Sequence, residues 1–430
     1  MRRRSLLGVA ATAIVAPIAA TGTQATADPD TTASSRAHRR WVNTWVSMPQ
    51  LTEPNNMPPP PFTQDNLVLA DATLRQTVRI TVGGQRLRLR FSNAFGGATL
   101  PITAVAVALP QDGKAGVSAI QPGTTHRVTF NGRSSVDISA GALVVSDPLD
   151  FPLAPGTVLT VTAYLATGQA SSSITSHPGS RTTSHLLAGN HVESTDLPNA
   201  TPTDHWYFLS GIEVLATPGT SGVVVIGDSL TDGRGSTTNG NDRWPDRLFD
   251  RLRADRRTAG VAVLNQAAGG NRVLNNGLGP SVLSRLDRDL LAQSRVRWLI
   301  LFEGVNDIGT AGPNEAAQKK VADELIAGYE QIVNRTQAHD IPVYGATLLP
   351  FGGNSYDDPG GFRETARQTV NRWIRTSRRF DAVIDFDAAV RDPANPRQLL
   401  PAFDVGDHLH LNPAGYRALA EAVPTRLFRS

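Results

Sequence analysis

The sequence of 430 residues contains no cysteine. This absence excludes a thiolate nucleophile, a cysteine-ligated metal and a disulfide scaffold. Lysine occurs only at positions 114, 319 and 320, so arginine carries nearly all of the positive charge. No stretch of the chain reaches the roughly 20 consecutive apolar residues that a membrane-spanning helix needs. A chain of this length therefore depends on ordinary packing for its stability, and its length predicts two domains.

The N-terminus has the three-part pattern of a signal peptide. Three arginines at 2–4 precede an alanine-rich apolar run, and small residues at 25–27 form a cleavage site. The segment 3–7 fits a twin-arginine signal, and a Sec signal is the alternative. We therefore expect removal of residues 1–27 and secretion. The remaining 38 basic and 38 acidic residues balance, so composition favours neither nucleic acid nor an anionic membrane as a partner.

The segment 41–216 has the pattern of an all-β domain. Residues 86–91 alternate strictly between polar and apolar, and residues 157–164 largely do so. Glycine pairs and an Asn-Gly pair supply turns between such runs. We predict a β-sandwich or jelly-roll-like domain over 41–216, preceded by a flexible polar segment at 28–40.

The segment 217–430 changes to an alternation of strands and helices. The expected strands are 223–227, 261–266, 298–303, 341–347 and 382–387. Helical patterns cover about 242–257, 281–293, 314–338, 360–379 and 412–427. Five apolar strands separated by helices predict an α/β fold, a doubly wound five-stranded parallel sheet in a three-layer α/β/α arrangement. Ligands bind such sheets at the carboxyl ends of the strands.

Polar residues and glycines follow three of these strands. Ser229 follows the first strand, the segment 265–271 follows the second, and the segment 303–307 follows the third. Asp407 and His410 stand just before the last helix and, three residues apart on a turn, can face one site. A serine, backbone donors, a side-chain amide and an Asp/His pair are the parts that acyl transfer needs.

These blocks, in this order, resemble the SGNH (GDSL-type) hydrolase family. The matching blocks are Gly227-Asp228-Ser229-Leu230, Asn265 to Asn271, Gly304-Val305-Asn306-Asp307 and Asp407-x-x-His410. The resemblance implies a serine ester hydrolase that needs no cofactor or metal. It implies that Ser229 is the nucleophile, that His410 is the base and that Asp407 orients His410. It also implies an oxyanion hole made by the Ser229 and Gly270 backbone N–H groups and the Asn306 side chain.

Two of these assignments have a close competitor. Gly269 is the alternative to Gly270 as a backbone donor, and the spacing from Asn265 in the family favours Gly270. His408 is the alternative to His410 as the base, and the Asp-x-x-His spacing favours His410. We expect His408 to face solvent or to pack locally.

Other polar residues near the blocks have structural interpretations. Asp228 and Asp307 are expected to bind backbone N–H groups. Glu303 is unusual in an apolar strand, and we expect it to orient its loop. Trp244 either helps to bind the substrate or packs at the start of a helix. The loop 354–358 lacks the ligand spacing of an EF-hand calcium site and is expected to be solvated.

The first domain has a narrower resemblance of its own. Segments 41–45, 90–96 and 205–211 look like the front domain of exported two-domain SGNH esterases. The tryptophans in these segments form either a sugar-stacking platform or, as we favour, part of a buried core. Histidines of this domain lack metal-ligand spacing and are expected at the surface or in turns: His126, His177, His185, His191 and His205. We expect the domain to affect stability or substrate choice, not bond cleavage.

The favoured function is an exported serine esterase that forms an acyl-enzyme on Ser229 and acts on short acyl chains, with acetyl esters of polysaccharides as a candidate substrate. A lipase or phospholipase of the same family is one alternative. A non-catalytic carbohydrate-binding protein is another. A flavin or nucleotide binder is disfavoured because no phosphate loop or Gly-x-Gly-x-x-Gly motif follows a strand. The oligomeric state is left open.

Overall fold

The computed structural model describes residues 39–429. The predicted signal peptide at 1–27 lies outside the described residues, as does most of the segment 28–40. The first strand already begins at Arg40. The described residues belong to one compact unit, in which an antiparallel β region precedes a parallel α/β region.

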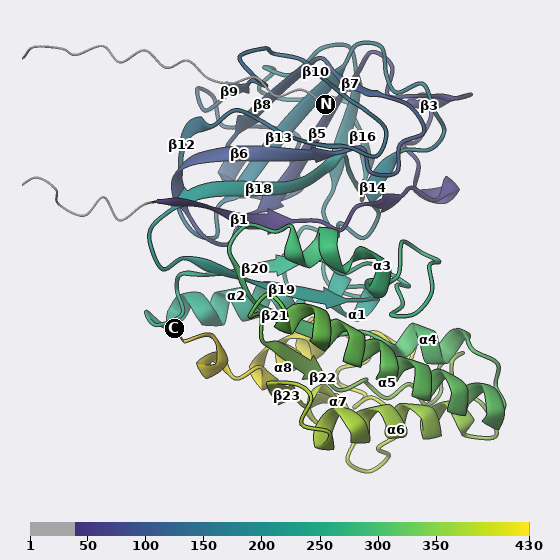
Figure 1. Ribbon diagram of the computed structural model, residues 1–430. Coiled ribbons are helices and arrows are strands. Elements are labelled where there is room, and N and C mark those ends of the chain that lie inside the picture. The colour runs from purple at the N-terminus through teal and green to yellow at the C-terminus, as the bar shows by residue number, and fades with distance from the viewer. Residues whose placement is uncertain (1–38, 430) are drawn as a thin grey trace, which may run out of the picture. The chain divides into compact units, whose positions relative to one another are not determined.

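The β region contains two large antiparallel sheets (Figure 1). The first contains β1 (Arg40–Val46), β18 (Leu209–Ala216), β6 (Gly84–Ser92), β11 (Leu143–Val145) and β12 (Leu149–Leu153). The second contains β16 (Thr201–Thr203), β15 (Ser184–Ala188), β5 (Ala72–Arg79), β13 (Val158–Leu165), β8 (Ala104–Ala108) and β9 (His126–Val128). The alternation predicted at 86–91 is confirmed, because Leu87, Leu89 and Phe91 are buried and the arginines between them are partly exposed.

Smaller elements complete the β region. Strands β17 (Trp206–Tyr207), β14 (Thr175–His177) and β2 (Gln50–Leu51) form a three-stranded sheet. Two further pairs are β10 (Val136–Ile138) with β7 (Leu100–Ile102), and β3 (Thr63–Gln64) with β4 (Leu67–Val68). Short 3-10 turns lie at η1 (Pro54–Asn56) and η2 (Gln111–Gly113). The region is thus β-rich, as its sequence pattern predicts.

The α/β region is built on a five-stranded parallel sheet. Its order is β20 (Val261–Asn265), β19 (Ser221–Gly227), β21 (Val296–Phe302), β22 (Val343–Ala346) and β23 (Ala382–Ile384). All four neighbouring pairs are parallel. Every residue of β19 is buried, which is why this strand is continuously apolar from Val223 to Ile226. The prediction of a doubly wound parallel sheet is confirmed.

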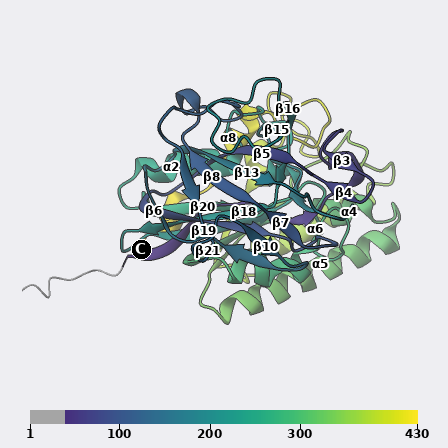
Figure 2. The same cartoon turned by 90° about the horizontal axis from the view of Figure 1, so that it is seen from above.

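Helices cover both faces of this sheet. They are α1 (Ser229–Asp232), α2 (Trp244–Ala254), α3 (Val282–Leu286), which continues into the π-helical turn η3 (Asp287–Leu291), α4 (Val305–Thr310), α5 (Glu315–Gln337), α6 (Phe362–Thr376), α7 (Phe386–Val390), α8 (Pro413–Ala422) and the 3-10 turn η4 (Thr425–Phe428). Helices α2 and α8 pack together on one side of the sheet, and α5 packs with α6 on the other (Figures 1 and 2).

Several element boundaries differ from the sequence-based expectation by a few residues, and two of them have a clear local cause. The strand expected at 382–387 ends at Ile384, because the Asp385 side chain accepts a hydrogen bond from the Ala388 N–H and starts helix α7. The last helix ends at Ala422, not at 427. Val423 stands before Pro424, and a residue before proline disfavours the helical conformation.

The sheet order places β19 at the point where the chain reverses its winding. The connections from β19 to β20 and from β20 to β21 leave β19 between the second and the third strand. A crevice opens outside the carboxyl ends of the strands at such a switch point, and ligands bind there. Ser229 is the second residue after β19 and therefore lies at this crevice.

Direct contacts join the β region to the α/β region. Strand β1 lies beside β20 (Figure 1). The Ser294 N–H donates to the Asn43 side-chain oxygen at 2.6 Å, and the Ser294 hydroxyl donates to the buried carboxylate of Glu213. Arg79 forms a 2.6 Å ion pair with Asp250 on α2. The β region is thus bonded to the sheet that carries Ser229.

Candidate active site

Ser229 is the first residue of helix α1 and follows a tight exit from β19. The Asp228 carboxylate accepts a hydrogen bond from the Leu230 N–H at 2.9 Å and so caps this helix, as the sequence predicts. A side chain at Gly227 would come within 2.8 Å of the Phe302 carbonyl oxygen, so only glycine fits at this exit. The Ser229 N–H is one of the first-turn donors that have no partner within a helix. It is therefore available to a ligand.

The Ser229 hydroxyl begins a chain of two hydrogen bonds. Its Oγ lies 2.8 Å from His410 Nε2, and His410 Nδ1 lies 2.6 Å from the Asp407 Oδ2. A carboxylate only accepts, so Nδ1 carries the proton and Nε2 is left to accept the proton of the serine. Asp407 Oδ1 also accepts from the His410 and Leu409 N–H groups, at 2.8 and 3.0 Å. These contacts fix the imidazole in the orientation that a general base needs.

The surroundings of His410 favour its neutral form. Burial lowers the pKa of the imidazole, the contact with Asp407 opposes this, and the positive charges of Arg234 and Arg181 lower the pKa again, so that it ends below its ordinary value. Burial of Asp407 acts to raise the pKa of its carboxyl, but hydrogen bonds from His410 and Leu409 hold that pKa below its usual range. The pair is therefore a neutral base next to an ionised carboxylate.

His408 points elsewhere. Its side chain is 53% exposed, and its Nδ1 lies 2.8 Å from the Asp404 carboxylate. Asp404 also accepts from the Gly406 and His408 N–H groups and so closes a turn on the surface. The structure therefore brings His410, and not His408, to Ser229.

The loop after β20 carries the two candidate backbone donors. The Ala268 N–H donates to the Gly227 carbonyl at 3.1 Å, which holds this loop against the exit of β19. The Gly269 N–H is occupied, because it donates to Asp232 Oδ2 at 3.0 Å. The Gly270 N–H bonds no acceptor among residues 39–429, and Gly270 has a φ of +72° that favours glycine. Gly270 is therefore the donor that remains free.

Asn306, the second residue of helix α4, supplies the amide. Its Nδ2 donates to the Asn271 carbonyl at 2.9 Å, which places it beside the Gly270 loop. An amide nitrogen has two hydrogens, so one remains for a ligand. The Asn306 Oδ1 accepts from the Tyr356 hydroxyl at 2.9 Å, which fixes the orientation of the amide.

Tyr356 was not anticipated from the sequence. It lies in the segment 354–358, for which only a solvated loop was expected. In the same loop, the Asn354 side chain donates to the Asp407 carbonyl at 2.6 Å. The loop therefore contacts both the amide donor and the histidine–aspartate turn. Only its aromatic residue sets it apart in the sequence, and nothing in the spacing connects it to Asn306.

Three buried acids lie behind the site. Asp307 accepts from the Val273 and Leu274 N–H groups at 2.9 and 3.0 Å, the backbone-binding role that the sequence predicts for it. Burial raises the pKa of Asp307 to about 6 and that of Asp228 to about 7. Burial also raises the pKa of Glu303 well above its ordinary value, which favours the protonated form of this side chain.

Glu303 lies near Arg285, which contacts the loop after β20. Its carboxyl oxygens have no hydrogen-bond partner in the part of the chain that the structure describes, and the nearest cation, Arg285, is 4.0 Å away. Arg285 in turn donates to the Gln266 carbonyl at 2.6 Å and to the Asn271 side chain at 3.0 Å. The loop after β20 is therefore held by Arg285, and the expected role of Glu303 in orienting its own loop is not seen in its contacts.

Two other expectations require correction. Trp244 has no exposed surface: its Nε1 donates to Thr231 Oγ1 at 3.2 Å and its ring packs on Phe386, so it cannot contact a substrate. His177 was expected at the surface or in a turn. It is only 4% exposed, because it lies between the β region and Asp232 of helix α1, 3.0 Å from the carboxylate.

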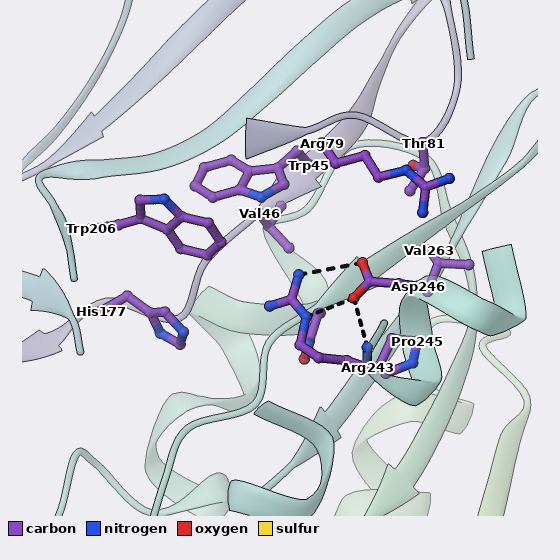
Figure 3. A pocket seen from close by; sticks show the side chains of 11 residues that line it. Trp45, Val46, Arg79, Thr81, His177, Trp206, Arg243, Pro245, Asp246 and Val263 are labelled. Atoms are coloured by element: carbon purple, nitrogen blue, oxygen red, sulfur yellow. Dashed lines mark hydrogen bonds and ion pairs between the residues drawn. The ribbon is translucent and has the colours of Figure 1, made fainter. Parts of the chain in front are cut away.

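The tryptophans of the β region are mainly core residues. Trp45 and Trp206 are buried and pack edge to face with ring centroids 4.9 Å apart. Both line a pocket between the β region and α2, whose other side is formed by Arg243, Pro245 and Asp246 (Figure 3). Ser229 does not line this pocket. The buried-core interpretation therefore holds for these two tryptophans.

The geometry defines a class before any comparison with known proteins. A serine bonded to a histidine, which is bonded to a carboxylate, stands at the carboxyl edge of a parallel sheet with donors beside it. This is the arrangement of a serine hydrolase.

Comparisons with known proteins agree with this class. Residues 225–418 match the model of the GDSL-like Lipase/Acylhydrolase family. Over these residues the chain is similar to that family, and the protein is a carboxylic ester hydrolase. No curated protein matches the chain. Among the described residues, no helix is long and apolar enough to cross a membrane.

Solved structures similar to this chain cover about half of it. One is a structure of a lipolytic protein of the G-D-S-L family from Desulfitobacterium hafniense, with 21% identity, 48% of this chain and 99% of that chain covered, and a TM-score of 0.36. Another is Axe2, an acetylxylan esterase from Geobacillus stearothermophilus, with 24% identity, 47% and 91% covered, and a TM-score of 0.35. A third is a GDSL-like lipase from Bacteroides thetaiotaomicron, with 17% identity, 47% and 85% covered, and a TM-score of 0.34.

Proposed function

We propose that this protein is an exported esterase that removes short acyl groups through an acyl-enzyme on Ser229. The observation that carries the proposal is the unbroken chain from Ser229 through His410 to Asp407, with contacts of 2.8 and 2.6 Å. In the first half-reaction, Ser229 Oγ attacks the ester carbonyl carbon while His410 Nε2 takes the hydroxyl proton. His410 then gives this proton to the leaving alcohol, and a bond from Oγ to the acyl carbon remains.

The second half-reaction uses the same groups on water. His410 takes a proton from water, the resulting hydroxide attacks the acyl carbon, and Ser229 leaves with the proton that His410 returns. In both halves, negative charge develops on the former carbonyl oxygen. The Ser229 and Gly270 N–H groups and the Asn306 amide are the donors proposed to stabilise it, and such stabilisation is generally the largest single contribution to the rate.

The exposure of the site supports a preference for short acyl groups. Only 7% of the Ser229 surface and 6% of the His410 surface is exposed. Leu278 is 51% exposed and lies so close to Gly270 that a side chain on Gly270 would overlap it. Leu278 therefore supplies an apolar surface beside a proposed donor, which a small acyl group can contact. Acetyl esters of a polysaccharide fit this description, since the acyl part is minimal.

Replacement of the nucleophile tests the chemical step. We expect Ser229→Ala to lower kcat for p-nitrophenyl acetate by on the order of 10³-fold or more, because the other members of such a unit retain only residual catalysis. A fluorophosphonate probe should label the wild type at Ser229 and leave the variant unlabelled. Ser284→Ala is a matched control on helix α3 and should behave as the wild type. Activity in Ser229→Ala with labelling of another serine would refute the proposal.

A substrate series tests the acyl preference, and a variant of the N-terminal segment tests export. A series of p-nitrophenyl esters from acetate to palmitate, an acetylated polysaccharide and a phospholipid should rank acetate highest, whereas a preference for palmitate or the phospholipid would identify a lipase. Export rests on the sequence of residues 1–27. Replacement of Arg3 and Arg4 by lysine should retain the protein inside the producing cell if the twin-arginine route is used.

A further inference from the structure

A histidine of the β region reaches the loop that carries Gly270. His177 is the last residue of β14, and its Nε2 lies 3.0 Å from Asp232 Oδ1 in helix α1. The other oxygen of the same carboxylate, Oδ2, accepts from the Gly269 N–H at 3.0 Å. One carboxylate thus joins the β region on one side to the residue before Gly270 on the other.

The position of His177 is strongly constrained. Its Nδ1 lies 3.1 Å from the Met48 carbonyl oxygen, so both ring nitrogens face oxygens that only accept. The two contacts hold the imidazole ring from both sides, between the Met48 backbone and helix α1. The ring stacks on Trp206 at 5.7 Å with an interplanar angle of 24°, and Figure 3 shows the two side by side at the pocket.

The backbone at Gly179, two residues after β14, also lies close to Asp232. A side chain on Gly179 would overlap the Asp232 carboxylate, so this glycine allows the β-region backbone to approach helix α1. Asp232 itself is 1% exposed. A buried carboxylate is costly unless it is paired and hydrogen-bonded, and His177 and the Gly269 N–H are the partners that the structure provides.

We propose that His177 is a positioning residue for the oxyanion hole, so that the β region takes part in the chemical step through Asp232. The inference rests on the proposed function, in which Gly270 is an oxyanion donor. The Gly269 N–H holds the loop to Asp232 through a hydrogen bond, and the contact with His177 holds the Asp232 carboxylate in place. If His177 is lost, Asp232 loses a hydrogen-bond partner and the peptide that carries the Gly270 N–H shifts. This differs from the expectation that the β region affects only stability or substrate choice.

Replacement of His177 should weaken stabilisation of the transition state and leave substrate binding nearly unchanged. An oxyanion donor must lie about 2.7–3.1 Å from the oxygen that develops charge, and the loss of one such donor costs about 10²–10³ in kcat. His177 does not touch the reacting atoms, so a smaller loss is expected when the donor is displaced and not removed. The loss should appear in kcat, because the ground-state carbonyl gains little from the same donor.

The experiment uses full-length variants with p-nitrophenyl acetate. We expect His177→Ala to lower kcat by about 10- to 100-fold with KM changed by less than about twofold. His177→Gln keeps an N–H donor near the position of Nε2 and should recover most of the loss. Gly179→Ala places a methyl group against the same carboxylate, nearest to Oδ2, and should reproduce the loss. His185→Ala is the matched control, since this β-region histidine bonds the Gly116 carbonyl at 3.0 Å and has no contact with Asp232.

A boronic acid inhibitor separates positioning from a general loss of structure. Its tetrahedral adduct with Ser229 places an oxygen in the oxyanion hole, so its affinity should fall in parallel with kcat in His177→Ala and Gly179→Ala, and recover in His177→Gln. Fluorophosphonate titration gives the concentration of intact sites by which each kcat is divided. If His177→Ala fails to fold, His177→Gln and Gly179→Ala still provide the comparison.

Three results would overturn the inference. They are a wild-type kcat per intact site in His177→Ala or Gly179→Ala, a change confined to KM, and a lower kcat with unchanged boronate affinity. The test is separate from that of the proposed function. If Ser229→Ala is inactive while His177→Ala is fully active, the inference alone fails; if Ser229→Ala is active, the proposed function fails.

Discussion

Each region of the chain contains an arginine without exposed surface. Arg75 on β5 donates to the Ser118 carbonyl at 2.6 Å and so holds a surface loop of the β region. Arg285 on helix α3 donates to the Asn271 side chain at 3.0 Å and forms a 3.0 Å ion pair with Asp289. The chemistry of the two side chains is the same: a buried guanidinium surrounded by oxygen acceptors.

The difference lies in the loop that each arginine holds. The loop bound by Arg75 is a connection within the β region, far along the chain from any proposed catalytic block. The loop bound by Arg285 includes Gly270 and ends beside Asn306. Both arginines thus stabilise the fold. Only Arg285 is expected to affect catalysis, because the loop that it holds carries a proposed oxyanion donor. Through the contact of His177 with Asp232, we propose, the β region also helps to hold the loop that carries Gly270.

The largest expected effect is at the base, within the α/β region. We expect His410→Ala to lower kcat by on the order of 10³-fold or more, because the hydroxyl of Ser229 then has no proton acceptor. His408→Ala, two residues away and paired only with Asp404, should stay close to wild-type activity. Steady-state kinetics on p-nitrophenyl acetate decide between them. An inactive His408 variant would mean that the base is assigned wrongly.

The amide donor should give the next largest effect. Asn306→Ala is expected to lower kcat by about 10²–10³, the loss typical of one oxyanion donor. Tyr356→Phe removes only the hydroxyl that orients this amide and should lower kcat less, with KM nearly unchanged. The values of kcat and KM, measured separately for both variants, test whether the loop at 354–358 supports the site. An unchanged kcat in Tyr356→Phe would show that this hydroxyl does not support the amide donor.

The two buried arginines provide a direct test of the comparison between regions. We expect Arg75→Met to leave partly buried carbonyls unpaired and to lower the free energy of unfolding by about 1–3 kcal/mol. We expect Arg285→Met to cost about 3–5 kcal/mol, because it breaks a buried ion pair. Denaturant unfolding measures both. Only Arg285→Met should also lower kcat per intact site, and an equal loss of kcat in Arg75→Met would contradict the comparison.

The smallest expected effect is on pH dependence. Because the pKa of His410 is lowered, its protonation, and with it the acid limb of kcat/KM, should lie below the ordinary histidine value of about 6.5. Arg181, in the β region, is one of the charges that lower this pKa. Arg181→Ala should therefore move the limb to higher pH, and the shift should shrink at high salt if the charge is screened. The exposed Arg133→Ala is the control, and an unmoved limb in Arg181→Ala would exclude this electrostatic link.

The sequence was sufficient to predict the α/β fold and the blocks at its sheet edge, since both depend on local patterns. Continuous apolar runs mark strands buried on both faces, and parallel strands bring their carboxyl ends to one edge whatever the rest of the chain does. Ser229, Gly270 and the Asp-x-x-His turn at 407–410 each follow or precede such an element directly. The order of the strands and helices therefore predicts that these residues lie at the same edge of the sheet.

Contacts between segments far apart in the chain were decided by the tertiary structure alone. His177 and Asp232 are 55 residues apart, and Tyr356 and Asn306 are 50 residues apart. Neither pair has a spacing that a helix or strand repeat would reveal, so no local pattern predicts it. Trp244 is a similar case, because its position at a helix start suited either exposure or burial until the packing on Phe386 decided it. Burial and pairing depend on which surfaces meet when the two regions fold together.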